Sequence, residues 1–262
     1  MNTHAANAFS ANEMMTIAAA RALRNTDVCF VGIGAPSAAC NLARLTHAPQ
    51  ITLIYESGTI GARPTVLPLS IGDGELCETA LTTVSVPEMF RYWLQGGRIT
   101  VGFLAGAQMD RYANLNTTVV GTYLTPKVRL PGGGGAPEIA ASCQEVFITM
   151  QMSPRTFVAQ LPFITSLGHG SGRGSREALG LRTKGPTRVM TDLCVLEPDP
   201  ESCELLVTSL HPGVTQEGAR AACGWPLRFA DRLVTTAAPS AQELQVLRDL
   251  QARSAAAHQE DP

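Results

Sequence analysis

Residues 28–45 read VCFVGIGAPSAACNLARL, in which an apolar run, a turn containing glycines and a stretch with helical spacing follow one another. Pro36 suits the first turn of a helix, because a proline there leaves no N–H that needs a partner. Leu42 and Leu45 stand three residues apart, on one face of the expected helix. This order of strand, turn and helix is the building unit of α/β sheets.

The same unit recurs along the first half of the chain. Apolar runs stand at ITLIYE (51–56), ITVGFLAG (99–106) and EVFITM (145–150), and the last follows a helical stretch, APEIAAS (136–142). Strands that are buried on both faces form continuous apolar runs of this kind, which are typical of a parallel sheet covered by helices. We therefore expect an α/β fold with an open, mostly parallel sheet flanked by helices.

Other elements are expected at both ends. The first helix should run from Asn12 to Leu23, after which the strands begin, and a last helix from about Ser240 to Ala257. The runs at 187–197 and 204–213 favour an antiparallel pair, hence an antiparallel extension of the sheet in the second half. Residues 1–262 show no repeat or linker, so we expect a single domain.

Composition excludes several classes of function. Charged residues make up 16% of the chain and the formal net charge is −2, which does not favour nucleic acid or an anionic membrane as a partner. No apolar run approaches the roughly 20 residues of a membrane span, and the first residues lack a signal-peptide pattern. Seven scattered cysteines without metal-ligand spacing indicate reduced thiols and no metal site. We expect a cytoplasmic protein.

Three segments could carry chemistry. Glu56 ends an apolar strand before Ser-Gly, at the edge where open α/β sheets bind ligands, although it could simply be a solvated strand end. The run PGGGGAPEIA (131–140) leaves backbone N–H groups free for an anion, or is a flexible loop. The segment GAQMDRYANLNTT (106–118), with Gln108, could bind a polar ligand or form a turn.

Two weaker candidates lie in the second half. Residues 171–188 hold five basic side chains against one acid, either as a solvated loop or as a site for a phosphorylated ligand such as CoA. His169 stands among glycines, but no nucleophile motif accompanies it, so we interpret it as structural.

Together, several ordered motifs resemble the β subunit of family I CoA-transferases, and the likeness spans nearly the whole chain. Within the family, the glutaconate CoA-transferase-like group is the most similar, because its members share the run YESGTIGARPTVLPLSIGDGE (55–75) nearly word for word. The motifs are VGIGAPSAACNLARL (31–45), YESGTIG (55–61), GGRITVGFLAGAQMDRYANLNTT (96–118), LPGGGGAPEIA (130–140), FITSLGHG (163–170) and VTSLHPGV (207–214).

The resemblance implies roles for particular residues. Glu56 falls on the catalytic glutamate, which carries CoA as a thioester, so that CoA is a substrate and no other cofactor is needed. The glycine loop at 133–135 falls on the oxyanion-binding loop, most directly through the Gly134 amide. The implied oxyanion and CoA-binding set is Gly133, Gly134, Gly135, Gly32, Gly34 and Gln108. Ketoacid transferases usually have asparagine where this chain has Ser57.

The resemblance also implies substrates and a partner. CoA would pass from succinyl-CoA to 3-oxoadipate, at the end of aromatic degradation, with glutaconate or another dicarboxylate as the alternative acceptor. Arg63 is a candidate for binding the acceptor carboxylate, or an ordinary surface arginine. An α subunit is expected to complete the site, in an α2β2 or larger assembly. Hydrolysis of CoA-linked diketones is a further alternative, which Glu56 disfavours, and a non-enzymatic sugar-phosphate sensor is another.

Overall fold

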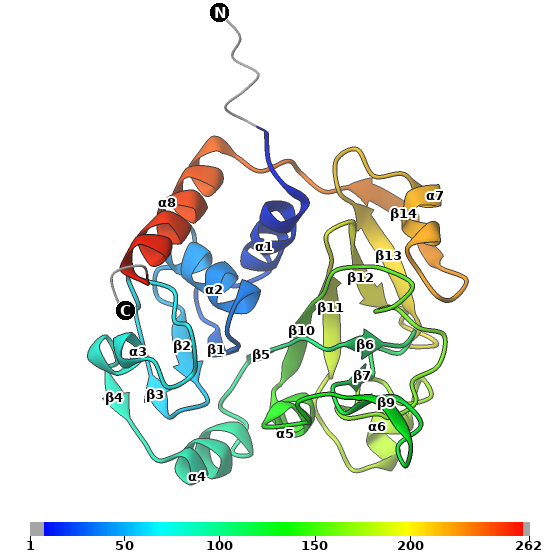
Figure 1. The fold of residues 1–262 in the computed structure, drawn as a ribbon, viewed down its shortest axis with the longest axis horizontal. Helices are drawn as coiled ribbons and strands as arrows, with labels where there is room; N and C mark the ends of the chain where they lie inside the picture. Colours follow the sequence, from blue (N-terminus) through cyan, green and yellow to red (C-terminus); the bar gives the residue numbers. More distant parts are fainter. Residues whose placement is uncertain (1–7, 259–262) are drawn as a thin grey trace, which may run out of the picture.

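The computed structural model describes residues 8–258 and has at its centre a ten-stranded sheet (Figure 1). Five neighbouring strands run parallel to one another, which confirms the expected open, mostly parallel sheet. In sheet order these strands are β2 (Thr52–Tyr55), β1 (Val28–Val31), β5 (Val101–Leu104), β10 (Glu145–Thr149) and β11 (Pro186–Met190).

The expected antiparallel extension is also present, but its strands differ from the prediction. The run 187–197 is two strands joined by a turn, because the hydroxyl of Thr191 accepts hydrogen bonds from the N–H groups of Leu193 and Cys194. The antiparallel pair is therefore formed by β12 (Cys194–Pro198) and β13 (Leu205–Leu210). The sequence pattern missed strands at both ends of the sheet, namely β14 (Arg228–Thr235) at one end and β3 (Thr59–Ile60) and β4 (Thr82–Thr83) at the other.

Helices cover both faces of the parallel strands. On one face lie α1 (Ala11–Arg21), α2 (Ala35–Leu45) and α8 (Ala241–Ala257), which gather in one corner of Figure 1. The other face holds a π-helix, η1 (Met89–Leu94), and α5 (Ala136–Ser142). The bounds of α5 and α8 confirm the predicted helices, and the first helix ends slightly earlier than predicted.

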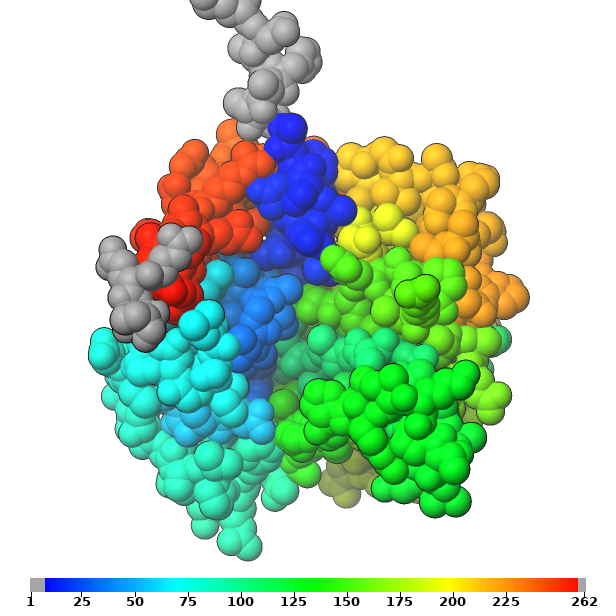
Figure 2. Space-filling model, in the orientation of Figure 1, coloured from blue at the N-terminus to red at the C-terminus, as the bar shows by residue number. Residues whose placement is uncertain are grey.

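Short elements fill the remaining loops. Two hairpins follow β5, and Figure 2 shows the green segment that contains the second of them at the front of one face. The short elements are α3 (Gly74–Glu78), α4 (Val86–Glu88), α6 (Ser175–Ala178), α7 (Gln216–Ala221), and the hairpins β6 (Gln108–Met109) with β7 (Leu115–Asn116) and β8 (Val119–Gly121) with β9 (Pro126–Arg129).

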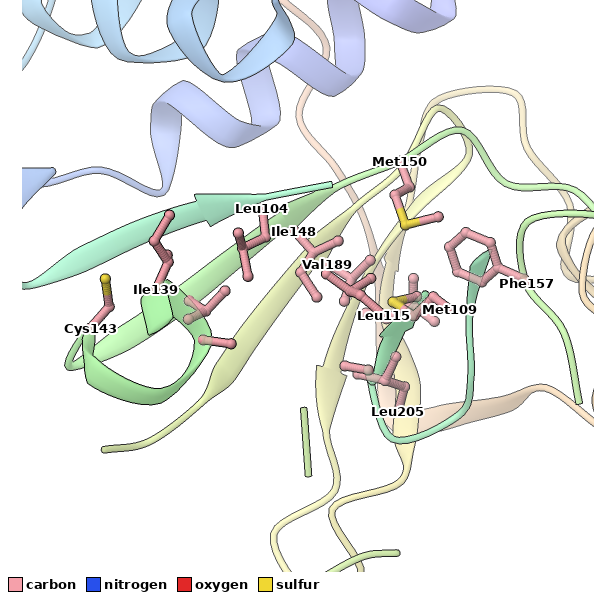
Figure 3. Packing of buried hydrophobic residues seen from close by; sticks show 14 of the residues in the cluster. Leu104, Met109, Leu115, Ile139, Cys143, Ile148, Met150, Phe157, Val189 and Leu205 are labelled. Atoms are coloured by element: carbon pink, nitrogen blue, oxygen red, sulfur yellow. The ribbon is translucent and has the colours of Figure 1, made fainter. Parts of the chain in front are cut away.

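The two faces of the sheet form separate apolar cores. Along β1, Cys29 and Val31 pack with α1, α2 and α8, whereas Phe30 points to the opposite side. Figure 3 shows part of the second core, in which Ile139 of α5 lies near Leu104 of β5, and Cys143, the residue that caps α5, lies beyond Ile139. Alternate residues are therefore buried on opposite faces, which explains the continuous apolar runs.

The connections create a topological switch point at one edge of the sheet. From β1 the chain passes to β2 on one side, and then returns to β5 on the other side of β1. The strand order thus reverses between β1 and β5, and ligands of open α/β sheets bind outside the carboxyl ends of strands at such a point. Glu56 and the glycines after β1 lie at this edge.

Other expectations concern the chain as a whole. Within residues 8–258 no helix is long and apolar enough to cross a membrane. All seven cysteines are free, and the described part of the chain brings together no group of histidine, cysteine and acidic residues suited to a metal ion. The domain expected over 1–262 includes residues 1–7 and 259–262, which lie outside the described residues.

Candidate active site

Glu56 is presented by the turn that ends β2. The N–H of Gly58 donates to the Tyr55 carbonyl at 3.0 Å, and Gly58 has a φ of +108°, which glycine adopts without strain. A side chain at Gly58 would overlap the carbonyl oxygen of Val84. The Ser-Gly that follows Glu56 therefore makes a tight turn, and the half-buried carboxylate stands at the carboxyl edge of the sheet.

The glycine loop reaches the Glu56 carboxylate directly. A methyl group added at Gly135 would lie 2.6 Å from Oε1 of Glu56 and 3.1 Å from its Cδ, so a larger residue there would displace the Glu56 side chain. Among residues 8–258, none accepts a hydrogen bond from the backbone N–H of Gly134 or Gly135. The structure thus places Gly135 beside the carboxylate, in a loop with two unpaired N–H donors.

Gln108 belongs to the same region through the β6–β7 hairpin. Its side-chain oxygen accepts a hydrogen bond of 3.0 Å from Nδ2 of Asn116, which is fully buried. The next residue, Thr117, accepts from the N–H of Gly132 at 2.8 Å through its carbonyl. Asn116 therefore fixes the orientation of the Gln108 amide, and the hairpin connects Gln108 to the glycine loop.

Gly32 and Gly34 stand beside the strand that carries Glu56. Val31 pairs with Tyr55 in the parallel register of β1 and β2, so the residues that follow each of them leave the sheet next to one another. Gly34 caps α2 with a φ of +81°, and no atom lies within 4 Å of the position that a side chain would occupy there. Space is therefore open at Gly34, whereas a side chain at Gly32 would contact Pro36.

Arg63 lies apart from these residues. It follows β3, which runs antiparallel to β2 and leads the chain away from Glu56, so that Ala62 donates to the carbonyl of Leu53. The pKa of Arg44, at the far end of α2, is lowered mainly by burial and secondly by the positive charge of Arg63. The structure therefore places Arg63 beside Arg44 and not beside the carboxylate.

Of the two candidates in the second half, His169 has a structural role, and so does one residue of the basic stretch 171–188. His169 is buried, its Nε2 donates to the Pro186 carbonyl at 2.7 Å, and burial lowers its pKa. In the basic stretch, Arg176 is buried and donates to the carbonyls of Ala140 and Gly168. Arg176 therefore joins loops together, and its guanidinium is not free for a phosphate.

The sequence interpretation missed two residues of this region. Phe90 belongs to η1, and its Cζ would lie 2.7 Å from a methyl group at Gly135. Nothing in PEMFRYWLQGG distinguishes this ring from its neighbours as a site residue. Asn116 could have been found among the clustered polar residues of 106–118, but its pairing with Gln108 is visible only in the fold.

The arrangement suits covalent catalysis. Glu56 forms no ion pair within the described residues, so no cation of this chain neutralises its carboxylate. An available carboxylate can act as a nucleophile. Preorganised N–H groups next to it can stabilise an oxyanion that forms on the attacked carbonyl.

Comparison with known proteins agrees with this geometry. The family model for coenzyme A transferase matches residues 12–219. The chain is 64% identical, over 96% of both proteins, to one of the subunits of 3-oxoadipate CoA-transferase from Pseudomonas knackmussii. It is 31% identical to one of the subunits of glutaconate CoA-transferase from Acidaminococcus fermentans, over 92% of both. The crystal structure of that glutaconate enzyme superposes with a TM-score of 0.87, at 29% identity, covering 92% of this chain and 94% of the other. The chain therefore belongs to the coenzyme A transferase family and is an enzyme of the CoA-transferase class.

Proposed function

We propose that this chain is the β subunit of a 3-oxoadipate CoA-transferase, which moves CoA from succinyl-CoA to 3-oxoadipate at the end of aromatic-compound degradation in the cytoplasm. The observation that carries the proposal is the close approach of Gly135 to the Glu56 carboxylate, in a loop where the N–H groups of Gly134 and Gly135 have no partner within residues 8–258. The choice of acceptor is supported by the 64% identity to a subunit of the Pseudomonas knackmussii enzyme of that name.

The reaction begins with attack by the Glu56 carboxylate on the acyl carbon of succinyl-CoA. The carbon–sulfur bond breaks, the CoA thiolate leaves, and a mixed anhydride of succinate and Glu56 forms. The thiolate then attacks the glutamyl carbonyl and succinate leaves, so that CoA stays on Glu56 as a thioester. Reversal with 3-oxoadipate completes a ping-pong exchange, for which no cofactor other than the substrate CoA is required.

The glycine loop and Gln108 would stabilise the oxyanions of these steps. Each attack gives a tetrahedral centre whose oxygen carries the negative charge, and one preorganised donor typically lowers such a barrier by about 3 to 4 kcal/mol. The N–H groups of Gly134 and Gly135 have no hydrogen-bond partner within residues 8–258, and Gly135 lies next to Glu56. Since Asn116 binds the oxygen of the Gln108 amide, the NH2 group of that amide is left to donate.

The proposal includes a partner subunit. The relatives from Pseudomonas knackmussii and Acidaminococcus fermentans are themselves subunits of their enzymes. In this chain Arg63, the cation expected for the acceptor carboxylate, lies beside Arg44 instead. An α subunit would supply the missing cationic groups, in an α2β2 or larger assembly. The chain would then bind CoA across its glycines while the acceptor is held by both subunits.

Glutaconate or another dicarboxylate is the second candidate acceptor. It is favoured by the close superposition with the Acidaminococcus fermentans glutaconate enzyme. Both reactions use the same carboxylate chemistry, so the Glu56 site does not separate them. The hydrolysis of CoA-linked diketones is a third candidate, and the presence of Glu56 in the turn disfavours it.

Steady-state kinetics of the complex formed with the α subunit test the acceptor. We expect parallel double-reciprocal lines with succinyl-CoA and 3-oxoadipate, and a kcat/KM for 3-oxoadipate at least about tenfold above that for glutaconate, because different chain lengths place the second carboxylate differently. A preference for glutaconate would reassign the acceptor. Release of free CoA without acyl transfer would contradict the transferase.

A further inference from the structure

Phe90 lies against the proposed catalytic groups without any role in the steps above. A methyl group at Gly135 would lie 2.7 Å from Cζ of Phe90 and 2.6 Å from Oε1 of Glu56. Because both atoms lie so close to one point, the ring edge and the carboxylate are neighbours over the glycine loop. Phe90 is half-buried, so the surrounding residues of this chain do not enclose it completely.

The ring is held in place by its surroundings. It meets Phe30 of β1 edge to face, with 6.1 Å between the ring centroids, and the flanking Met89 and Leu94 are fully buried. The N–H of Gln95 donates to the Phe90 carbonyl, which is the i+5 pairing of a π-helix. Such segments are rare, and they often occur at functional sites. The core of the protein thus positions an apolar ring beside a carboxylate.

A thioester on Glu56 needs protection from water. If water attacks the glutamyl carbonyl, its oxygen bonds to that carbon, the carbon–sulfur bond breaks, CoA leaves as a thiolate and the proton passes to solvent. The Glu56 carboxylate is restored, and the succinyl-CoA is lost by hydrolysis. A transferase therefore has to keep water away from this carbonyl while the acceptor acid enters.

We propose that Phe90 is the residue of this chain that determines transfer over hydrolysis, by covering the Glu56 carbonyl with its ring edge. The inference rests on the proposed function, because it presupposes the Glu56 thioester. Phe90 makes no bond to the substrate and is a positioning residue. Its removal should admit water at the Gly135 side of the carbonyl without removing a catalytic group.

The test compares variants of the complete complex with the α subunit. The complex is incubated with succinyl-CoA alone, and the release of free CoA is compared with the rate of transfer when 3-oxoadipate or glutaconate is present. In Phe90→Ala the ratio of hydrolysis to transfer should rise about tenfold or more, since a barrier change of about 1.36 kcal/mol suffices. Phe90→Leu, which retains apolar bulk, should stay within about threefold of the unchanged protein.

Tyr92→Ala is the matched control, because it also removes an aromatic ring from the π-helix. Tyr92 is 58% exposed. Its ratio should not change. Phe90→Val, which retains some packing against Phe30, replaces Phe90→Ala where that variant does not assemble. An unchanged ratio in an assembled Phe90→Ala or Phe90→Val complex overturns the inference. If the unchanged protein shows no CoA on Glu56, the proposed function fails first, and the two failures are distinguishable.

Discussion

At Gly135 the space that a side chain would need is already taken by the carboxylate of Glu56 and the ring of Phe90. The sequence predicted the importance of the glycine run and of Glu56 separately, and their contact is a property of the fold. The four glycines are not equivalent, because Gly134 has a φ of +51° whereas Gly135 has a φ of −80°, which any residue adopts. Glycine is therefore favoured at position 135 because a side chain there would meet Glu56 and Phe90, and not because of the backbone conformation.

Gly135→Ala should impair catalysis and leave folding nearly unchanged. The added methyl group displaces Glu56 or Phe90, and a misplacement of about 1 Å at a reacting group typically costs about 10²-fold in rate. Stability should change by less than about 1 kcal/mol, because the backbone angle suits alanine. The measurements are kcat in the complex and urea unfolding of the chain.

Gly74→Ala is the control for this change. It begins α3, where no atom lies within 4 Å of the added methyl group. Its kcat should equal that of the unchanged protein. Equal kcat values in both variants would show that Gly135 is not in contact with the reacting carboxylate during catalysis.

At the scale of elements, the longer helices were predicted more closely than the short helices and the strands at the ends of the sheet. The helix at 136–142 begins after glycine with proline in its first turn, so its start follows from local signals. By contrast, the turn between β11 and β12 contains neither glycine nor proline, so the run 187–197 looked continuous. Edge strand β14 is largely exposed and lacks an apolar pattern, so only its pairing with β13 defines it.

Two buried histidines join elements of the second half and should make stability depend on pH. His169 donates to Pro186 at the start of β11, and His211 at the end of β13 donates through Nε2 to the Thr191 carbonyl at 2.9 Å. Burial lowers the pKa of both rings below the ordinary 6.5. The unfolded chain thus binds more protons below pH 6.5, and stability is lost as the pH falls from there toward the folded pKa values.

Urea unfolding between about pH 7.5 and 5.5 measures this dependence. The free energy of unfolding should fall with acidification in the unchanged chain, because each unit of pKa difference is worth about 1.4 kcal/mol. The double variant His169→Gln and His211→Gln should be less stable at the upper end of this range and should show a flatter dependence. If the free energy of unfolding of the double variant fell with pH as steeply as that of the unchanged chain, groups other than these two histidines would cause the loss of stability.

At the scale of the whole molecule, the sequence predicted the sheet and the edge of it that carries Glu56. It did not predict that Arg63 lies away from this edge. The apolar runs predict parallel strands, and the position of Glu56 after one of them places it at the carboxyl edge. Arg63 is seven residues from Glu56 in sequence, yet β3 leads the chain away from the site. Only the antiparallel turn after β2 reveals this separation.

The chain alone should therefore have very little transferase activity. Its Glu56 has no cationic partner within the described residues, and Arg63, the cation expected for the acceptor carboxylate, lies beside Arg44. We expect a rate at least about 10³-fold below that of the complex, since binding and orientation both suffer. Adding the separately purified α subunit should restore the rate, whereas full activity of the isolated chain would contradict the need for a partner.

The most direct measurement is the intact mass of this chain after the complex has been incubated with succinyl-CoA, followed by borohydride reduction and peptide mapping. We expect a CoA adduct, or its reduced product, on Glu56. The adduct should be absent from Glu56→Ala and present in Glu78→Ala, which changes an exposed glutamate of α3. An active complex without an adduct on Glu56, or with the adduct on another residue, would contradict the central claim that Glu56 carries CoA.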